Sequence, residues 1–285
     1  MTRLISINND CDGYQQLIDF YNEHKDKFFE DIPLELTYWF SANMCSALGG
    51  ILDLLMNNLN DIKFDKISSG IERILLKNDF LSYYGFQSLY DDYHTTIRYM
   101  KLKPGDGKYF NHYIYQEVLS RNELPQMSQL VKEKMTEAIY EIFVNAQIHS
   151  ESNFIYTCGQ FYPNKNLIEF TITDTGIGFK RKINERFNSR LSSIQAIKWA
   201  IQDGKTTKTD MSGGLGLTLL KEFIEKNKGK MQIISDDGFY QYDTQGEQIN
   251  TFSGSFPGTI VNLQFKTDDN SSYYLTQEIN SSNIF

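Results

Sequence analysis

Along the first third of the chain, the spacing of apolar residues alternates between the period of about 3.6 residues typical of helices and the period of 2 typical of strands. The spacing of Leu17 and Tyr21 predicts a helix within residues 12–30, and the aromatic and branched run LELTYWF predicts a strand after it. A helix through MCSALGGILDLL, an alternating strand over residues 62–67 and a helix over IERILLKNDFLSYY come next. This strand–helix order predicts a small α/β domain over residues 1–94.

The second half of the chain begins with a helical stretch, EAIYEIFVNAQIHS, at residues 137–150. Positions four apart lie on the same side of a helix, so Glu141, Asn145 and His149 form one polar side. The opposite side suits burial because it carries Ile139, Ile142, Phe143 and Ala146. Two polar groups one turn apart beside an apolar stripe can ligand a metal and orient a water.

Extended runs dominate the remainder of this half. NFIYTCGQFYP and LIEFTIT, separated by a short polar turn, predict a β-hairpin. MQIIS and TIVNLQF would complete a sheet, with a tyrosine- and glycine-rich excursion between them. Residues 95–127 contain a strand (TTIRYMKL), a turn and a helix, and we expect a connector packed between the two halves. Residues 269–285 would form a tail.

Charge and cysteine content limit the classes of partner. Acidic residues outnumber basic ones by 36 to 28, which gives a net charge of −8 and a pI near 5.1. This balance disfavours broad binding to nucleic acid or to an anionic membrane. The three cysteines are scattered without CxxC spacing and indicate reduced thiols, and no apolar run is long enough to span a bilayer. We therefore expect a cytoplasmic protein.

Two glycine motifs follow the polar helix. The predicted hairpin ends at DTGIG, residues 174–178, where two glycines after a carboxylate let a ligand approach the backbone closely. Residues 179–212 are polar, mobile in character and rich in lysine, and they lead to SGGLGL at residues 212–217. This second motif starts a helix, where free N–H groups and the helix dipole favour an anion.

In this order the motifs resemble the GHKL ATP-binding family. A helix with ExxxN, a strand ending in DxGxG, a lid and GxGL at a helix start extend over residues 128–268. The family includes sensor histidine kinases, anti-sigma-factor kinases, DNA gyrase, a mismatch-repair ATPase and a heat-shock chaperone. The NAxxH run is most similar to the two kinase branches. The resemblance implies an α/β fold of the Bergerat type, an α+β two-layer sandwich with a mixed sheet under helices.

The resemblance also implies ATP and Mg²⁺ as ligands and assigns roles on the polar helix. Asn145 would ligand Mg²⁺ through its side-chain oxygen, as suits a hard cation. Glu141 would be the general base that polarises a water or a phospho-acceptor hydroxyl. His149 more often packs against backbone at such a position than it touches phosphate, so its role stays open.

The remaining roles concern the nucleotide. Asp174 would accept a hydrogen bond from the adenine amino group, and Gly176 and Gly178 would let the backbone pass beside the purine. Thr259 would lie beside Asp174 near adenine, and Lys208 would reach the γ-phosphate from the lid. The phosphates would be held by Gly214, Leu215, Gly216 and Leu217.

The amino-terminal pattern over residues 30–84 resembles the STAS fold of anti-sigma-factor antagonists. In that family a serine at a helix start can be phosphorylated by a partner kinase. Ser41 and Ser46 are the nearest positions, but Phe40-Ser41 replaces the usual Asp-Ser pair. We therefore interpret Ser41 as a helix cap.

Three activities are compatible with these motifs. The first is a serine protein kinase, similar to the anti-sigma-factor kinases, acting on a regulatory protein partner. The second is an ATPase whose nucleotide state switches a lid or a homodimer, and the third is a non-enzymatic ATP-sensing module of a stress, toxin–antitoxin or phage-defence system. A conventional histidine kinase is disfavoured because RNELPQMSQLVKEKM, before the ATP-binding motifs, contains no histidine.

Overall fold

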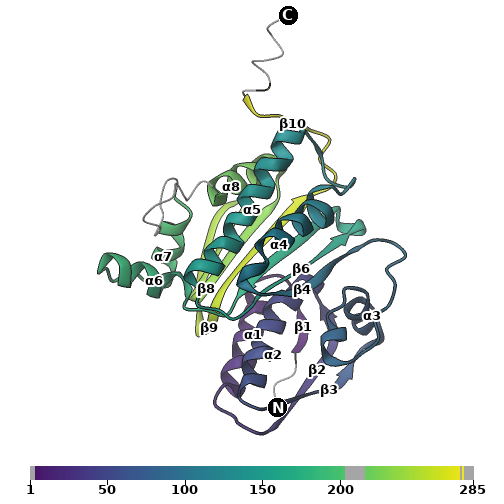
Figure 1. Cartoon of the computed structure of the whole chain (residues 1–285), viewed down its shortest axis with the longest axis vertical. Helices are drawn as coiled ribbons and strands as arrows, with labels where there is room; N and C mark the ends of the chain where they lie inside the picture. The colour runs from purple at the N-terminus through teal and green to yellow at the C-terminus, as the bar shows by residue number, and fades with distance from the viewer. Residues whose placement is uncertain (1–3, 203–215, 277, 279–285) are drawn as a thin grey trace, which may run out of the picture.

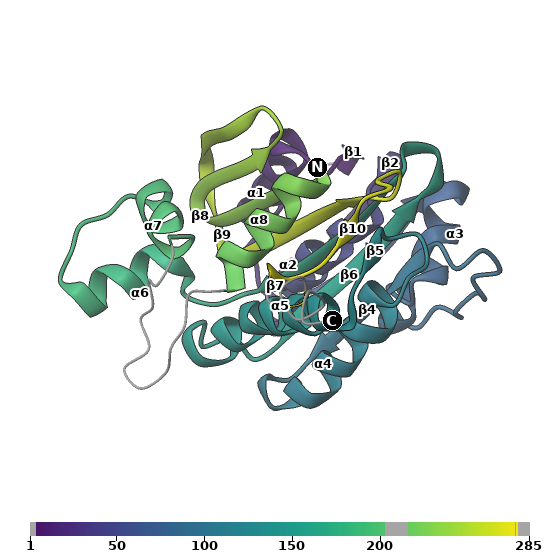
Figure 2. The same cartoon turned by 90° about the horizontal axis from the view of Figure 1, so that it is seen from above.

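The computed structural model describes residues 4–202, 216–276 and 278, and its centre is a five-stranded sheet with helices on both faces (Figures 1 and 2). All neighbouring strands of this sheet are antiparallel. Their order is β4 (Thr96–Leu102), β6 (Ile155–Tyr162), β7 (Leu167–Asp174), β9 (Gly246–Lys266) and β8 (Lys230–Asp243).

One face of the sheet is covered by α4 (Gly107–Ile114), α5 (Gln129–His149) and α8 (Gly216–Asn227). Apolar and polar residues alternate along β7, so the apolar side chains of that alternation point to this face. Phe170, for example, packs with Phe143 of α5 in one core. Helices over a sheet were expected from the sequence and are confirmed. The parallel pairs of the expected mixed arrangement lie elsewhere, in the amino-terminal sheet and between β5 (Gln126–Met127) and β10 (Ser272–Tyr273).

The opposite face is covered by the amino-terminal region. Its sheet has the order β1 (Leu4–Ile7), β2 (Asp31–Phe40) and β3 (Asp61–Ile67), and its helices are α1 (Cys11–His24), α2 (Cys45–Asn57) and α3 (Ser69–Lys77). Leu48 and Ile51 of α2 share an apolar core with Tyr156 and Ile260 of the five-stranded sheet. Both faces of the central sheet are therefore buried.

Polar residues of β7 lie on this second face and are also buried. Asn43 Nδ2 donates to Thr171 Oγ1 at 3.0 Å, and Thr173 Oγ1 donates to Ser46 Oγ at 3.1 Å. All four of these side chains are fully buried. The amino-terminal region thus replaces water as the partner of the polar side of the sheet.

Two local expectations about the amino-terminal helices were wrong. Ser41 precedes a 3₁₀ turn (Ala42–Met44) and makes no capping bond, because its hydroxyl instead accepts a hydrogen bond of 3.2 Å from Trp39 Nε1. The helix expected over IERILLKNDFLSYY ends at Lys77, since Asn78 Oδ1 accepts from Phe80 N at 3.0 Å and turns the chain. A separate 3₁₀ turn, Leu81–Tyr84, follows.

The segment from 95 to 127 contributes directly to the central layers. β4 forms an edge of the five-stranded sheet by pairing with β6, and α4 packs on α5, with Phe110 stacked on Phe143 at 4.5 Å between ring centroids. A short π-helical turn, Tyr115–Leu119, continues α4.

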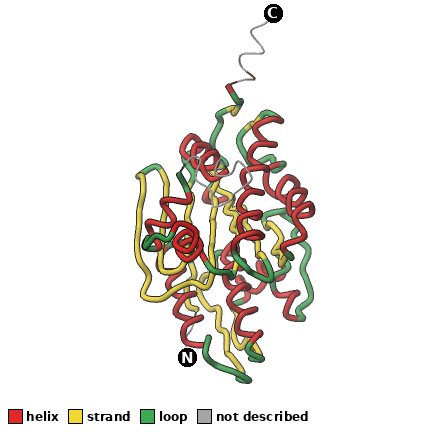
Figure 3. Tube along the Cα trace, turned by 60° about the vertical axis from the view of Figure 1, so that its left-hand side comes forward, coloured by secondary structure: helices red, strands yellow, loops and turns green. Residues whose placement is uncertain are grey.

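The expected excursion between the last two long strands is instead a continuation of both. β8 and β9 remain paired out to Asp243 and Gly246, past irregularities at Asp236 and Gly238. Figure 3 shows this hairpin in yellow at the outer edge of the molecule. Its β9 strand lies along α1, where Ser253 N donates to Gln15 Oε1 at 3.0 Å.

The polar segment after DTGIG also has more regular structure than expected. It forms α6 (Gly178–Phe187) and α7 (Ser193–Ala200), and Ser192 and Gln195 make a capping box at the start of α7. The three cysteines are free thiols, as predicted. No helix within the described ranges has the length and hydrophobicity needed to cross a bilayer.

Candidate functional site

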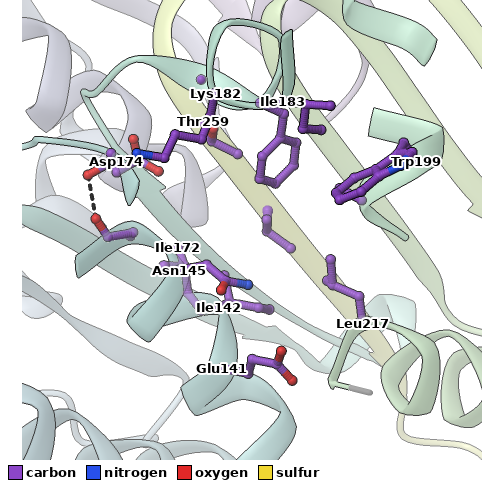
Figure 4. A pocket seen from close by; sticks show the side chains of 16 residues that line it. Glu141, Ile142, Asn145, Ile172, Asp174, Lys182, Ile183, Trp199, Leu217 and Thr259 are labelled. Carbon is purple, nitrogen blue, oxygen red and sulfur yellow. Dashed lines mark hydrogen bonds between the residues drawn. The ribbon is translucent and has the colours of Figure 1, made fainter. Parts of the chain in front are cut away.

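The polar side of α5 faces a pocket. Glu141 and Asn145, one helical turn apart, line it together with Ile142 and Ala146 (Figure 4). On the far side of the helix Phe143 is completely buried in the core. The amphipathic pattern of α5 therefore fixes which of its side chains reach the pocket.

The opposite end of the pocket holds Asp174, the last residue of β7. It pairs in register with Thr259 of β9, and both residues line the pocket. Gly176 N donates to Asp174 Oδ1 at 3.0 Å. Burial nevertheless raises the pKa of Asp174 to about 7, because the backbone hydrogen bonds from Gly176 and Thr259 only partly offset the loss of hydration.

The DTGIG loop is held tightly against the end of α5. A Cβ on Gly176 would lie 1.9 Å from the carbonyl oxygen of Ser150, and Ile177 N donates to the same oxygen at 2.8 Å. Gly178 has a φ of +69°, which favours glycine, and starts α6. Glycine at these positions lets the loop connect the Asp174 end of the pocket to α5.

The outer wall contains residues that were not assigned a role from the sequence. Lys182 comes from α6 together with Phe179 and Ile183, and Trp199 comes from α7. Trp199 also packs on Phe187 at 5.3 Å between ring centroids. The sequence feature that could have indicated this wall is the apolar pair Phe179 and Ile183, which are four residues apart and so lie on one side of a helix, with Lys182 next to Ile183.

The structure brings together most of the residues predicted for the site. Glu141, Asn145, Asp174, Gly178, Leu217 and Thr259 all line this one pocket, whereas Gly176 lines a different one. Gly216 is the first residue of α8. Lys208, Gly214, Leu215 and the side chain of His149 lie outside the described part of the chain.

The lining suits a flat organic group joined to charged groups. The pocket is partly open to solvent, and its lining is mostly apolar with a few polar groups, as is common in small-molecule sites. Apolar walls from Ile172 and Val261 lie near the buried carboxyl of Asp174, while Asn145 and Glu141 lie at the α5 side. Across residues 4–202, 216–276 and 278, His, Cys, Asp and Glu form no group of three that could hold a metal alone.

Residues 130–268 match the sequence model of the histidine kinase-, DNA gyrase B- and HSP90-like ATPase family. The carboxy-terminal domain belongs to this family. The match starts at the second residue of α5 and ends beyond β9, so this GHKL domain includes every residue of the pocket. It is a nucleotide-binding module of the GHKL type, and the resemblance noted in the sequence is confirmed.

The comparisons say less about the rest of the chain. The family match leaves out residues 1–129, and the STAS resemblance stays a prediction. A comparison with curated proteins gives no match.

Proposed function

We propose that this protein is a Mg-ATP-dependent regulatory kinase that phosphorylates a serine of a partner protein. The observation that supports it is the placement of Glu141 and Asn145 side by side in the GHKL pocket that also holds Asp174. A general base and a metal ligand on one helix are what phosphoryl transfer requires beyond nucleotide binding.

The nucleotide would bind with its adenine beside Asp174. An ionised carboxyl accepts from the exocyclic amino group, and the apolar walls at Ile172 and Val261 suit the purine faces. The phosphates would then extend toward the α5 side of the pocket, beside Asn145 and Glu141. The selectivity for adenine over guanine would come from the carboxylate, which guanine O6 cannot donate to.

Mg²⁺ fits this pocket as a companion of the nucleotide. Asn145 offers one side-chain oxygen, and the described ranges hold no acidic cluster that would bind a resident metal. Protein-bound Mg²⁺ commonly keeps several waters and takes its other ligands from substrate phosphates. When bound, the ion would neutralise charge on the transferring group.

Glu141 would accept the proton of the attacking hydroxyl. That hydroxyl comes from another protein, because Ser41 and Ser46, the candidates within the amino-terminal region, are 5% and 0% exposed. If water takes the same place beside Glu141, the protein is instead an ATPase whose nucleotide state switches its conformation. A non-enzymatic ATP-sensing module is the third alternative.

Incubation with γ-labelled ATP and Mg²⁺, with and without cell lysate, tests the proposal. Label on a lysate protein that disappears with Glu141→Ala would support the kinase, whereas free phosphate alone would support the ATPase. Glu137→Ala is the matched control, since this glutamate lies one turn earlier on α5 and its side chain is 62% exposed. If ATP binds but neither labelled protein nor free phosphate forms, the protein is a sensing module and the proposed catalysis is refuted.

A further inference from the structure

A protruding loop carries large side chains into solvent far from the nucleotide pocket. It spans residues 85–95 between α3 and β4, at the opposite end of the molecule from α6 and α7 (Figures 1 and 2). Tyr90 and Tyr93 are 74% and 77% exposed, and Phe86 and Leu89 are 37% and 45% exposed. Exposed apolar side chains grouped in this way commonly mark an interaction site.

The loop is fixed by a buried ion pair. Lys77 Nζ lies 3.2 Å from Asp91 Oδ1, with side chains only 6% and 11% exposed. The second oxygen of Asp91 accepts from Thr96 N at 2.7 Å and from Thr96 Oγ1 at 2.8 Å. These contacts, which also hold the pKa of Asp91 below its usual range, present the neighbouring tyrosines on a defined backbone.

Three of the exposed rings make defined contacts with the rest of the fold. Lys77 Nζ lies 5.5 Å from the centroid of the Tyr93 ring, and the Tyr90 ring meets that of His94 at 6.3 Å. Phe86 packs edge-on against Phe64 at 5.7 Å. Rings that are positioned before binding lose little conformational entropy when a partner covers their open side, as in many interface hot spots.

An acidic groove adjoins the loop. It starts at Tyr93 and His94 and continues along residues 116–123, where Glu117 and Glu123 lie. Arg121 also lines it. Its guanidinium donates to the carbonyl oxygens of Glu117 (2.7 Å), His94 (2.8 Å) and Thr96 (2.7 Å), and its Nη1 lies 3.6 Å from Glu123 Oε1. These contacts attach the loop to the end of α4. The loop adds Asp92, whose side chain is 64% exposed and lies 3.9 Å from Lys77 Nζ. Loop and groove together carry four carboxylates (Asp91, Asp92, Glu117 and Glu123) against the two cations Lys77 and Arg121, so the surface stays acidic.

We propose that this tyrosine–acid surface (Phe86, Leu89, Tyr90, Asp92, Tyr93, Glu117 and Glu123) binds a protein segment in which Lys or Arg alternates with apolar residues. Tyrosine faces attract cations, and the carboxylates supply the matching charge. The same carboxylates repel the phosphates of nucleic acid and of anionic lipid. The surface is separate from the ATP pocket, so its role does not depend on the activity of Glu141.

A display selection of random peptides against the full chain tests this inference. We expect enriched peptides to contain Lys or Arg beside apolar residues. In fluorescence anisotropy, their affinity should fall about tenfold or more with Tyr90→Ala/Tyr93→Ala, several-fold with Asp92→Lys, and also with added salt. Tyr38→Ala is the matched control, because Tyr38 is 80% exposed on β2 and lies outside the surface.

Several outcomes would overturn the proposal. Peptides that bind the double tyrosine variant as well as the wild type would place the site elsewhere, and enrichment of acidic peptides would contradict the charge argument. Binding of a labelled single-stranded oligonucleotide that depends on Tyr90 and Tyr93 would make the surface a nucleic-acid site. ATP binding should be unchanged in these variants. A loss of peptide binding can therefore be distinguished from damage to the nucleotide pocket.

Discussion

The side-chain amide of Asn43 donates a hydrogen bond to the hydroxyl of Thr171 at 3.0 Å, across the boundary between the amino-terminal region and the GHKL domain. The same amide donates to Asn262 Oδ1 of β9 at 3.1 Å. Thr171 lies on β7, three residues before Asp174. The strand that ends at the buried carboxyl is therefore bonded directly to the amino-terminal region.

Replacing Asn43 tests how much this contact stabilises the protein. Asn43→Ala should lower the free energy of unfolding by about 1–3 kcal/mol, because it removes a buried donor from two buried acceptors. Urea denaturation followed by circular dichroism measures the change. Asn164→Ala, at an exposed turn residue, should change the free energy by less than about 0.5 kcal/mol. Equal effects would mean that the bond contributes nothing net.

Replacing Asp174 should separate stability from binding. Its pKa of about 7 in the folded protein lies above the ordinary 3.8, so the folded state binds the proton more tightly than the unfolded state does. The wild type therefore loses stability as the pH rises from about 4 through 7, whereas Asp174→Asn does not. Relative to wild type, the variant should gain on the order of 4 kcal/mol between pH 4 and pH 8, yet lose ATP binding. A stability difference that is constant with pH would refute this ionisation.

The same carboxyl should make adenine binding depend on pH. The carboxylate accepts from the adenine amino group, and one pH unit below its pKa of about 7 only about a tenth of it is ionised. The dissociation constant should therefore rise about tenfold from pH 8 to pH 6. Calorimetric titration with adenosine measures this without interference from titrating phosphates. An affinity that does not change with pH would exclude Asp174 as the acceptor.

Lys182 is the cation among the described residues that line the pocket, so we expect it to attract the phosphates of ATP rather than the neutral adenine. Lys182→Ala should weaken ATP binding about tenfold to a hundredfold, the value of one charge-assisted hydrogen bond, and leave adenosine affinity nearly unchanged. Trp199 shares the pocket with Lys182, so its fluorescence in a Trp39→Phe background reports occupancy. Arg181→Ala is the control, since Arg181 is 63% exposed and pairs with Glu185. Loss of adenosine binding as well would indicate a collapsed pocket.

The sequence predicted the side of the pocket formed by α5 and the DTGIG loop, because that side depends on residues close together in the chain. Glu141 and Asn145 lie on one side of α5 because helix geometry alone places them there, and DTGIG ends a strand because its glycines break the pattern. These features depend on neighbours within a few residues. Periodicity is therefore sufficient to find them.

The outer wall and the domain contacts depend on distant neighbours, and the sequence did not predict them. α6 is rich in charged residues, so its apolar pair Phe179 and Ile183 gave a weak helical signal. Thr171 and Thr173 alternate with apolar residues along β7, a pattern typical of a strand with one wet face. That face is dry because Asn43 and Ser46, more than a hundred positions earlier, supply its hydrogen bonds.

The burial of both faces of the central sheet limits how this ATP-binding unit can be moved between proteins. A fragment starting at residue 128 would uncover Tyr156 and Ile260, which are 2% and 1% exposed in the whole chain, and would also lack the edge strand β4. Such a fragment should aggregate or require a new cover for that surface. In gene fusion or protein engineering, the transferable cassette therefore includes the amino-terminal region and the β10 strand as well as the family match.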